Sequence, residues 1–157
     1  VGLLLEIFSR SCKETLISCE SSLKLDYFKK ITRDIPWALI TAGDEMETSD
    51  IYKKRGFASL FEYGIHGSPL SKCSIVLKLI DKHGIKSLNR VLFIGDSYTD
   101  YELAMHFDAI FLGISEWSHC SRLKCNTNSF VCYPLLDTFI MNYAKLGEIA
   151  MNLTSNG

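Results

Sequence analysis

The sequence predicts an α/β domain with a mostly parallel sheet. Residues 37–41, 91–95 and 109–113 are short apolar runs typical of buried strands, and helical patterns separate them. Strands that alternate with helices favour parallel pairing, because each helix carries the chain back to the same end of the sheet. A length of 157 residues suits one domain.

Composition and charge exclude several classes of protein. Hydrophobic residues make up 47% of the chain and charged residues 22%, as in folded globular proteins. The 17 basic and 18 acidic residues form no basic stripe, so nothing indicates a nucleic-acid partner. No apolar run reaches the roughly 20 residues of a membrane span, and Glu6 interrupts the N-terminal stretch, which does not fit a signal peptide. We expect neither nucleic acid nor a membrane as partner.

The cysteines favour a reducing compartment. A domain of this size can bury a core without disulfides, and the spacing around His119 lacks the second ligand pair of a zinc site. We therefore expect reduced thiols in a cytoplasmic protein. The six cysteines are Cys12, Cys19, Cys73, Cys120, Cys125 and Cys132.

The N-terminal part is expected to be helical. Apolar residues recur at helical spacing over 3–18, and a second short helix is expected at 25–31. Pro36 then breaks the chain before the strand at 37–41, and residues 42–44 are expected to turn.

The middle of the chain alternates again. Residues 45–55 form a polar helical pattern, and Gly56 suits the left-handed position after its end. A short strand at 61–66 and a loop at 67–69 are expected next. Residues 72–83 then form an amphipathic helix that Gly84 closes.

The last third repeats the pattern. The run 91–95 is fully apolar, like strands that are buried on both faces of a parallel sheet. A helix at 99–107 and a strand at 109–113 follow. The remaining elements are expected to be a polar loop, an edge strand and a final helix, at 115–129, 130–133 and 135–151.

Four polar residues fall where the carboxyl ends of the strands are expected. Thr41 ends one strand, Asp96 follows another, Asp100 lies one helical turn later, and Lys72 begins a helix. Ligands of parallel sheets bind at this rim. Two carboxylates one turn apart can hold Mg²⁺, and a hydroxyl, an ammonium and backbone N–H groups suit phosphate oxygens.

Each of these residues also has a purely structural interpretation. Thr41 could simply end its strand, and Lys72 could be solvated. Asp96 could cap the next helix, and Asp100 could interact with the dipole of that helix. The position of all four on one predicted rim favours a functional site.

Three stretches in chain order resemble motifs of the haloacid dehalogenase-like (HAD) hydrolase superfamily. Trp37-Ala-Leu-Ile-Thr41 is similar to the second motif of that family, and Ser68-Pro-Leu-Ser-Lys72 to the third. Val91-Leu-Phe-Ile-Gly-Asp-Ser-Tyr-Thr-Asp100 is similar to the fourth, which is Gly-Asp-Ser-x-x-Asp after an apolar strand. The resemblance spans residues 25–115 and implies a Rossmann-like, three-layer fold.

The resemblance also implies a function, namely a Mg²⁺-dependent phosphatase that acts on a small phosphate monoester. Asp96 and Asp100 would hold Mg²⁺, and Lys72 would stabilise the phosphoryl group and orient the nucleophile. The run Gly67-Ser-Pro-x-x-Lys72 is similar to members that act on sugar phosphates. Catalytic residues would be Thr41, Lys72 and Asp100, and phosphate-binding residues would be Thr41, Ala42, Gly43 and Lys72.

The nucleophile motif of the family, Asp-x-Asp-Gly-Thr after an apolar strand, does not occur in these 157 residues. The nearest imitation would place Glu6 as nucleophile and Phe8 where the family has its acid. We expect instead that residues 1–31 are the end of a helical cap region and residues 32–157 an incomplete core, so that the chain is a C-terminal fragment.

The resemblance therefore implies an incomplete sheet. In the family, the nucleophile strand lies at the centre, between the strands that here end at Thr41 and Gly95. A chain without that strand is expected to have a gap in its sheet or a non-standard pairing.

Two rival functions remain open. The domain could keep the HAD fold without catalysis and bind a phosphate or a partner, which the absent nucleophile motif favours. Alternatively, Gly95-Asp-Ser97 resembles the nucleophile block of GDSL-type esterases, with Ser97 as nucleophile. That family has Asp-x-x-His near its C-terminus, and none follows here.

Overall fold

The computed structural model of the chain describes residues 13–21, 24–116, 118 and 131–143. The chain divides into two compact units, one of Val1–Ser21 with Thr32–Gly84 and one of Ser22–Ile31 with Ile85–Gly157. Each unit is described by itself below. The expected boundary between a cap region and a core at residue 31 stays a prediction.

The first unit contains a two-stranded parallel sheet of β1 (Leu39–Asp44) and β2 (Ile65–Ser68). Between the paired positions Ile40↔His66 and Asp44↔Ser68, β1 advances four residues while β2 advances two. Residues 41–43 therefore bulge out of the ladder. The expected strand at 37–41 starts later and runs through the expected turn at 42–44, because the bulge lets the chain rejoin β2.

The second strand was predicted too early, at 61–66. A 3-10 helix, η1 (Ala58–Leu60), and a turn occupy the preceding residues. Gly64 has a φ of +91°, which interrupts extended backbone, and β2 begins only after it. Two residues of the predicted loop at 67–69 consequently belong to β2.

Helices α3 (Glu45–Lys54) and α4 (Lys72–His83) follow the two strands. Asp44 caps α3, and Ser71 caps α4 by accepting the N–H of Ser74. Gly56 has a φ of +76°, which confirms the predicted left-handed position, and Gly84 ends α4 as predicted, with a φ of +61°. The apolar stripe of α4 is buried at Ile75, Val76 and Leu79.

Residues 13–18 form a helix that is tied to the end of α3. The Arg55 guanidinium donates to the carbonyls of Leu16 (3.0 Å) and Cys19 (2.8 Å). Lys13 and Asp50 form an ion pair with an N–O distance of 2.6 Å. The rest of the helix expected at 3–18, including Glu6 and Phe8, lies outside the described residues.

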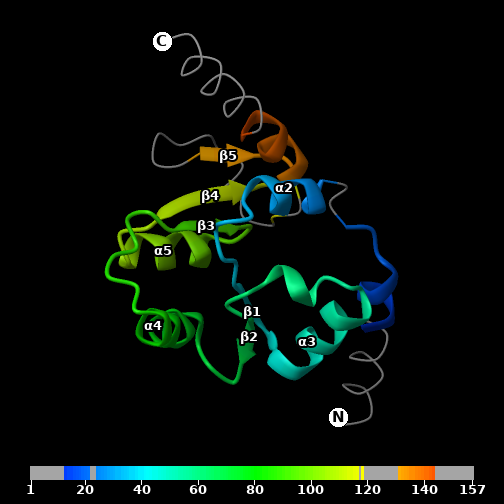
Figure 1. The fold of residues 1–157 in the computed structure, drawn as a ribbon, viewed down its shortest axis with the longest axis horizontal. Helices are drawn as coiled ribbons and strands as arrows, with labels where there is room; N and C mark the ends of the chain where they lie inside the picture. The colour runs from blue at the N-terminus through cyan, green and yellow to red at the C-terminus, as the bar shows by residue number, and fades with distance from the viewer. Residues whose placement is uncertain (1–12, 22–23, 117, 119–130, 144–157) are drawn as a thin grey trace. The chain divides into compact units, whose positions relative to one another are not determined.

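The second unit is built on a parallel sheet in the order β3 (Leu92–Gly95), β4 (Ile110–Ile114) and β5 (Val131–Tyr133), as Figure 1 shows. Helix α5 (Tyr98–His106) joins β3 to β4, and its Tyr101 ring packs edge-on against Phe111. Helix α2 (Leu25–Ile31) has the predicted bounds. Its Phe28 packs against Phe139 of the helical residues 136–143.

The predicted edge strand at 130–133 is confirmed as β5. Only part of the expected final helix at 135–151 and of the expected loop at 115–129 lies within the described residues. Cys19, Cys73 and Cys132 are unbonded thiols, and the other three cysteines lie outside the described part. None of the described helices is long and apolar enough to cross a membrane.

The expectation that the run 91–95 is buried on both faces is wrong. Leu92 and Ile94 are each 41% exposed, whereas the next strand buries Phe111 and Leu112. Strand β3 is the edge of its sheet, and within the described residues it pairs only with β4. Among the described residues, β1–β2 and β3–β4–β5 are separate ladders, and no strand pairing joins the strands that carry Thr41 and Gly95.

Candidate functional site

Thr41 lies in the bulge at the carboxyl end of β1. Its Oγ1 accepts the N–H of Gly43 at 3.1 Å, a bond within the residues at which the β1–β2 register shifts. Ala42 and Gly43 are exposed, and Thr41 is half-buried. A bulge that directs polar groups outward is a common way to build a binding site at a sheet end.

Lys72 stands at the same end of the same sheet. It is the first residue of α4, which starts after the carboxyl end of β2, and it is half-buried. The first unit thus places two of the four predicted residues at one sheet end. This sheet end suits an anion, because the start of α4 and the Lys72 ammonium each favour negative charge.

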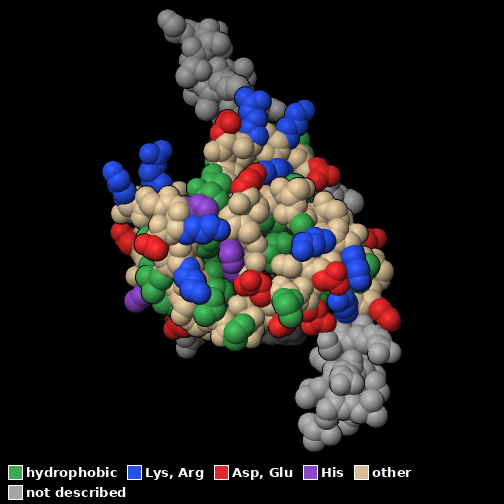
Figure 2. Space-filling model, turned by 60° about the horizontal axis from the view of Figure 1, so that its bottom comes forward, with side chains coloured by type: hydrophobic (Ala, Val, Ile, Leu, Met, Phe, Trp, Pro, Cys, Tyr) green, Lys and Arg blue, Asp and Glu red, His purple; other side chains and the backbone are tan. Residues whose placement is uncertain are grey.

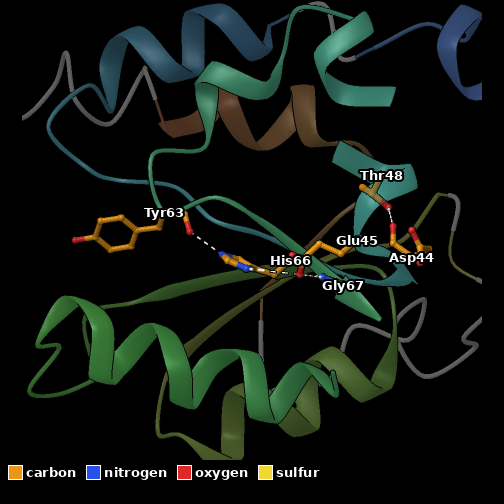
Figure 3. A network of polar contacts seen from close by, with 6 residues as sticks. All are labelled: Asp44, Glu45, Thr48, Tyr63, His66 and Gly67. Atoms are coloured by element: carbon orange, nitrogen blue, oxygen red, sulfur yellow. Dashed lines mark hydrogen bonds and ion pairs between the residues drawn. The ribbon is translucent and has the colours of Figure 1, made fainter. Parts of the chain in front are cut away.

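A polar network joins this sheet end to the start of α3 (Figure 3). Glu45, the first residue of α3, accepts the N–H of Gly67 on β2 through Oε2 at 3.1 Å. Asp44 accepts the N–H of Glu47 at 2.8 Å, and the Thr48 hydroxyl donates to the Asp44 carbonyl at 2.7 Å. The segment after the bulge is therefore fixed on both sides.

The second unit places Asp96 directly after β3. Its side chain is exposed and has no hydrogen-bond or ion-pair partner within the part of the chain that the structure describes. Its backbone carbonyl accepts the hydroxyl of Ser118 at 2.5 Å, and Ser118 is only 3% exposed. The backbone of the turn that carries Asp96 is thus held by the Ser118 hydrogen bond, while the carboxylate faces solvent.

Asp100 is held by a capping box at the start of α5. Its Oδ2 accepts the Ser97 hydroxyl at 2.6 Å and the Ser97 N–H at 3.3 Å, while the Ser97 Oγ accepts the N–H of Asp100. Ser97, rather than Asp96, is the N-cap, so the structural alternative for Asp96 is wrong. Asp100 does stabilise the start of α5, in line with the structural interpretation given for it in the sequence analysis.

These carboxylates fit a hard divalent cation of low protein-ligand count. The described residues contain no group of three or more His, Cys, Asp or Glu side chains that could form a protein cage. Mg²⁺ does not require one, since it usually keeps water and takes one or two carboxylates with substrate phosphate. Asp96 offers an uncommitted carboxylate for such an ion, and Asp100 lies one turn further along.

The sequence analysis missed Glu45 in the first unit and Ser118 in the second, and it named Gly67 only as part of the run Gly67-Ser-Pro-x-x-Lys72. Glu45 was part of a polar helix pattern, and Ser118 was part of a polar loop. Gly67 is buried, and a Cβ there would lie 3.0 Å from the Glu45 nitrogen. The close approach of β2 to the α3 start, which no local pattern signals, explains why a glycine is needed.

Comparison with known proteins supports the fold. No model of a protein family and no curated protein sequence matches the chain. The structure is similar to a haloacid dehalogenase-like hydrolase from Streptococcus pneumoniae, with a TM-score of 0.65 and 17% identity over 82% of this chain. It is also similar to a HAD-superfamily hydrolase from Ehrlichia chaffeensis, with a TM-score of 0.57 and 15% identity over 90% of this chain.

These similarities define the class of fold. The chain has a HAD-like, Rossmann-type α/β fold with parallel strands, as the sequence predicted. The chain spans 61% of the length of the Streptococcus structure and 74% of the Ehrlichia structure. At these identities the comparison extends to the fold alone.

Proposed function

We propose that the chain is part of a Mg²⁺-dependent HAD-like phosphatase that acts on a small phosphate monoester. The observation that carries the proposal is Asp96, a carboxylate without a partner among the described residues, on an anchored turn directly after a strand of a HAD-like fold. The proposed reaction passes through an aspartyl-phosphate, whose Asp-x-Asp-Gly-Thr motif is not among the 157 residues.

The residues of each unit have separate roles in this proposal. In the first unit, the bulge at 41–43 binds phosphate oxygens through Thr41 and backbone N–H groups, and Lys72 adds a positive charge. In the second unit, Asp96 and Asp100 hold Mg²⁺. When bound, the ion supplies positive charge that offsets the repulsion between a carboxylate and a phosphate. Sugar phosphates are a suitable substrate class in this proposal.

A non-catalytic HAD-fold binding domain is the second candidate. The absence of the nucleophile motif from these residues favours it, and it predicts the same phosphate and Mg²⁺ binding without turnover. The esterase alternative gains no support, because the Ser97 hydroxyl contacts Thr99 and Asp100 and serves as a helix cap. A nucleophilic serine needs a general base within hydrogen-bond reach, which in GDSL-type esterases is a histidine.

An NMR titration of the ¹⁵N-labelled chain with inorganic phosphate, with and without Mg²⁺, tests the proposal. We expect Mg²⁺-dependent shifts at the amides of residues 41–43. Lys72→Ala should weaken phosphate binding about tenfold, whereas the matched control Lys78→Ala, an exposed lysine of the same helix, should not. Asp96→Asn should remove the Mg²⁺ dependence, and Glu102→Gln on α5 should leave it intact.

A variant of Ser97 separates the rival hydrolases. Ser97→Ala should keep most of the phosphate binding, and the wild-type chain should not cleave an acyl ester such as p-nitrophenyl acetate. Ester cleavage that Ser97→Ala abolishes would overturn the phosphatase proposal in favour of the esterase. Phosphate-induced amide shifts that are the same in Lys72→Ala and Asp96→Asn as in the wild type would overturn the proposed site.

A further inference from the structure

The bulge at 41–43 is packed against β2 backbone to backbone. Gly67 is buried in β2, and a Cβ on it would overlap the carbonyl oxygen of Gly43 and lie 3.2 Å from the Glu45 Cα. No side chain separates the two segments. Any displacement of β2 at Gly67 is therefore transmitted directly to the segment that we assign to phosphate binding.

Glu45 completes the hydrogen bonding at this contact. The Gly67 N–H lies outside the β1–β2 ladder, because the Leu39 N–H donates to the Gly64 carbonyl and the even-numbered residues of β2 therefore face β1. The Gly67 N–H donates instead to Glu45 Oε2 at 3.1 Å. A buried N–H without an acceptor costs free energy, so the carboxylate stabilises the contact between β2 and the start of α3, which follows the bulge in the chain.

His66 borders the same carboxylate without taking over its contact. The Nε2 atom of His66 lies 2.7 Å from the Tyr63 carbonyl, which can only accept, so this nitrogen carries the hydrogen. Its Nδ1 lies 3.9 Å from Glu45 Oε2, which is too far for a hydrogen bond. Figure 3 shows the imidazole lying between Tyr63 and Glu45. The hydrogen bond from the Gly67 N–H to Glu45 therefore links α3 to β2 without involving His66.

We propose that Glu45 is a positioning residue, which holds the Thr41–Gly43 bulge in its phosphate-binding conformation through the Gly67 N–H. The inference rests on the proposed function, since it concerns the same phosphate site. Glu45 itself does not contact the phosphate in this proposal, because its carboxylate is engaged by the β2 backbone. What matters is an acceptor oxygen at that place, so glutamine should substitute for glutamate.

Three variants separate the hydrogen bond from the charge. Glu45→Gln keeps an acceptor oxygen and removes a negative charge near the proposed phosphate site. Glu45→Ala removes both. The difference between these two variants therefore measures the acceptor alone. Asp81→Ala, which deletes an exposed carboxylate from α4 in the same unit, is the control for general charge.

The experiment combines two readouts on the ¹⁵N-labelled chain. Amide hydrogen exchange reports the Gly67 and Gly43 N–H groups without any ligand, and titration with inorganic phosphate in Mg²⁺ gives the affinity. Relative to Glu45→Gln, we expect Glu45→Ala to exchange the Gly67 amide at least tenfold faster and to bind phosphate about tenfold more weakly. Asp81→Ala should match the wild type in both.

The outcomes distinguish this inference from the proposed function. If the wild-type chain does not bind phosphate at residues 41–43, the proposed phosphate site fails, and the positioning role fails with it. If the wild type binds but Glu45→Ala and Glu45→Gln bind equally well, only the positioning role is overturned. Faster exchange at Gly67 with unchanged phosphate affinity would likewise reduce Glu45 to a structural contact.

Discussion

Two glycines beside the proposed ligand groups differ in the side chain that they tolerate. A Cβ on Gly43 would lie 3.5 Å from Thr41 Oγ1, which is an ordinary contact. A Cβ on Gly95 would lie 2.6 Å from the Asp100 Cβ and 2.7 Å from its Oδ2, so the capping carboxylate would have to move. The close contact explains why glycine ends β3.

We expect Gly95→Ala to lower the free energy of unfolding by about 1–3 kcal/mol, the usual cost of overpacking. Gly43→Ala should change it by less than about 0.5 kcal/mol. Urea unfolding followed by circular dichroism measures both. Equal effects of the two substitutions would contradict the geometry at Gly95.

Tyr52 makes the stability sensitive to alkaline pH. Burial raises the pKa of the Tyr52 phenol above its ordinary value of about 10, although the nearby Arg55 charge acts in the opposite direction. A raised pKa in the folded state stabilises the fold below pH 10, and this contribution is lost as the pH rises through the folded-state pKa. Tyr52→Phe should therefore flatten the loss of stability above pH 10.

Urea midpoints of the wild type and Tyr52→Phe, compared between pH 8 and pH 11, measure this effect. Tyr27, which is 42% exposed, provides the matched control, and Tyr27→Phe should follow the wild-type curve. An identical pH profile for Tyr52→Phe and the wild type would show that the phenol does not contribute.

Sequence reasoning could locate the site residues that follow apolar strands. Asp96 and Asp100 sit next to β3, and Lys72 begins α4, so local patterns were enough to place them on their elements. Glu45 and Ser118 could not be found in this way. Each acts through a hydrogen bond to a residue 22 positions away, and only the folded chain brings those partners together.

At the scale of elements, helices were easier to predict than strands. The bounds of α2 and α4 agree with the sequence prediction, because caps and left-handed glycines are local chemistry. The start of β2 was misplaced by four residues. The bounds of a strand depend on its pairing with a neighbouring strand. Here the bounds of β2 depend on the turn at Gly64 and on the bulge in β1, and neither is indicated by the hydrophobic pattern of the sequence.

The capping box of α5 should contribute measurably to stability. Ser97→Ala removes the acceptor of the Asp100 N–H and the donor to its carboxylate, and we expect a loss of about 1 kcal/mol in the free energy of unfolding. Ser97→Thr keeps the hydroxyl and should restore most of it. A Ser97→Ala protein as stable as the wild type in urea would show that the cap has no energetic role.

At the scale of the whole molecule, acidic and basic side chains are mixed. On the face seen in Figure 2, neither sign gathers into one large patch, in keeping with the net charge of −1. The proposed ligand is a small anion, which needs only local groups such as the 41–43 bulge and Lys72. Recognition of a long polyanion would require an extended basic surface.

The residues that we assign to binding do not supply the nucleophile. In the proposed chemistry, a carboxylate nucleophile attacks phosphorus, and neither Asp96 nor Asp100 is suited to this role. Both are assigned to the metal, and Asp100 is in addition engaged by Ser97. Catalysis therefore needs both binding groups and a separate attacking group. Of the motifs that we identify in these 157 residues, all supply binding groups and none supplies the attacking group.

We accordingly expect the purified 157-residue chain to bind phosphate weakly but not to turn over a phosphate monoester. A phosphate-release assay with p-nitrophenyl phosphate, with and without Mg²⁺, measures this. Mg²⁺-dependent release would show that another carboxylate attacks, and Glu6 is the first to examine, because it follows an apolar run. Loss of that release in Glu6→Ala, but not in the control Glu14→Ala, would identify Glu6 as the nucleophile. In that case, the segment around Glu6 would be a functional variant of the Asp-x-Asp-Gly-Thr motif.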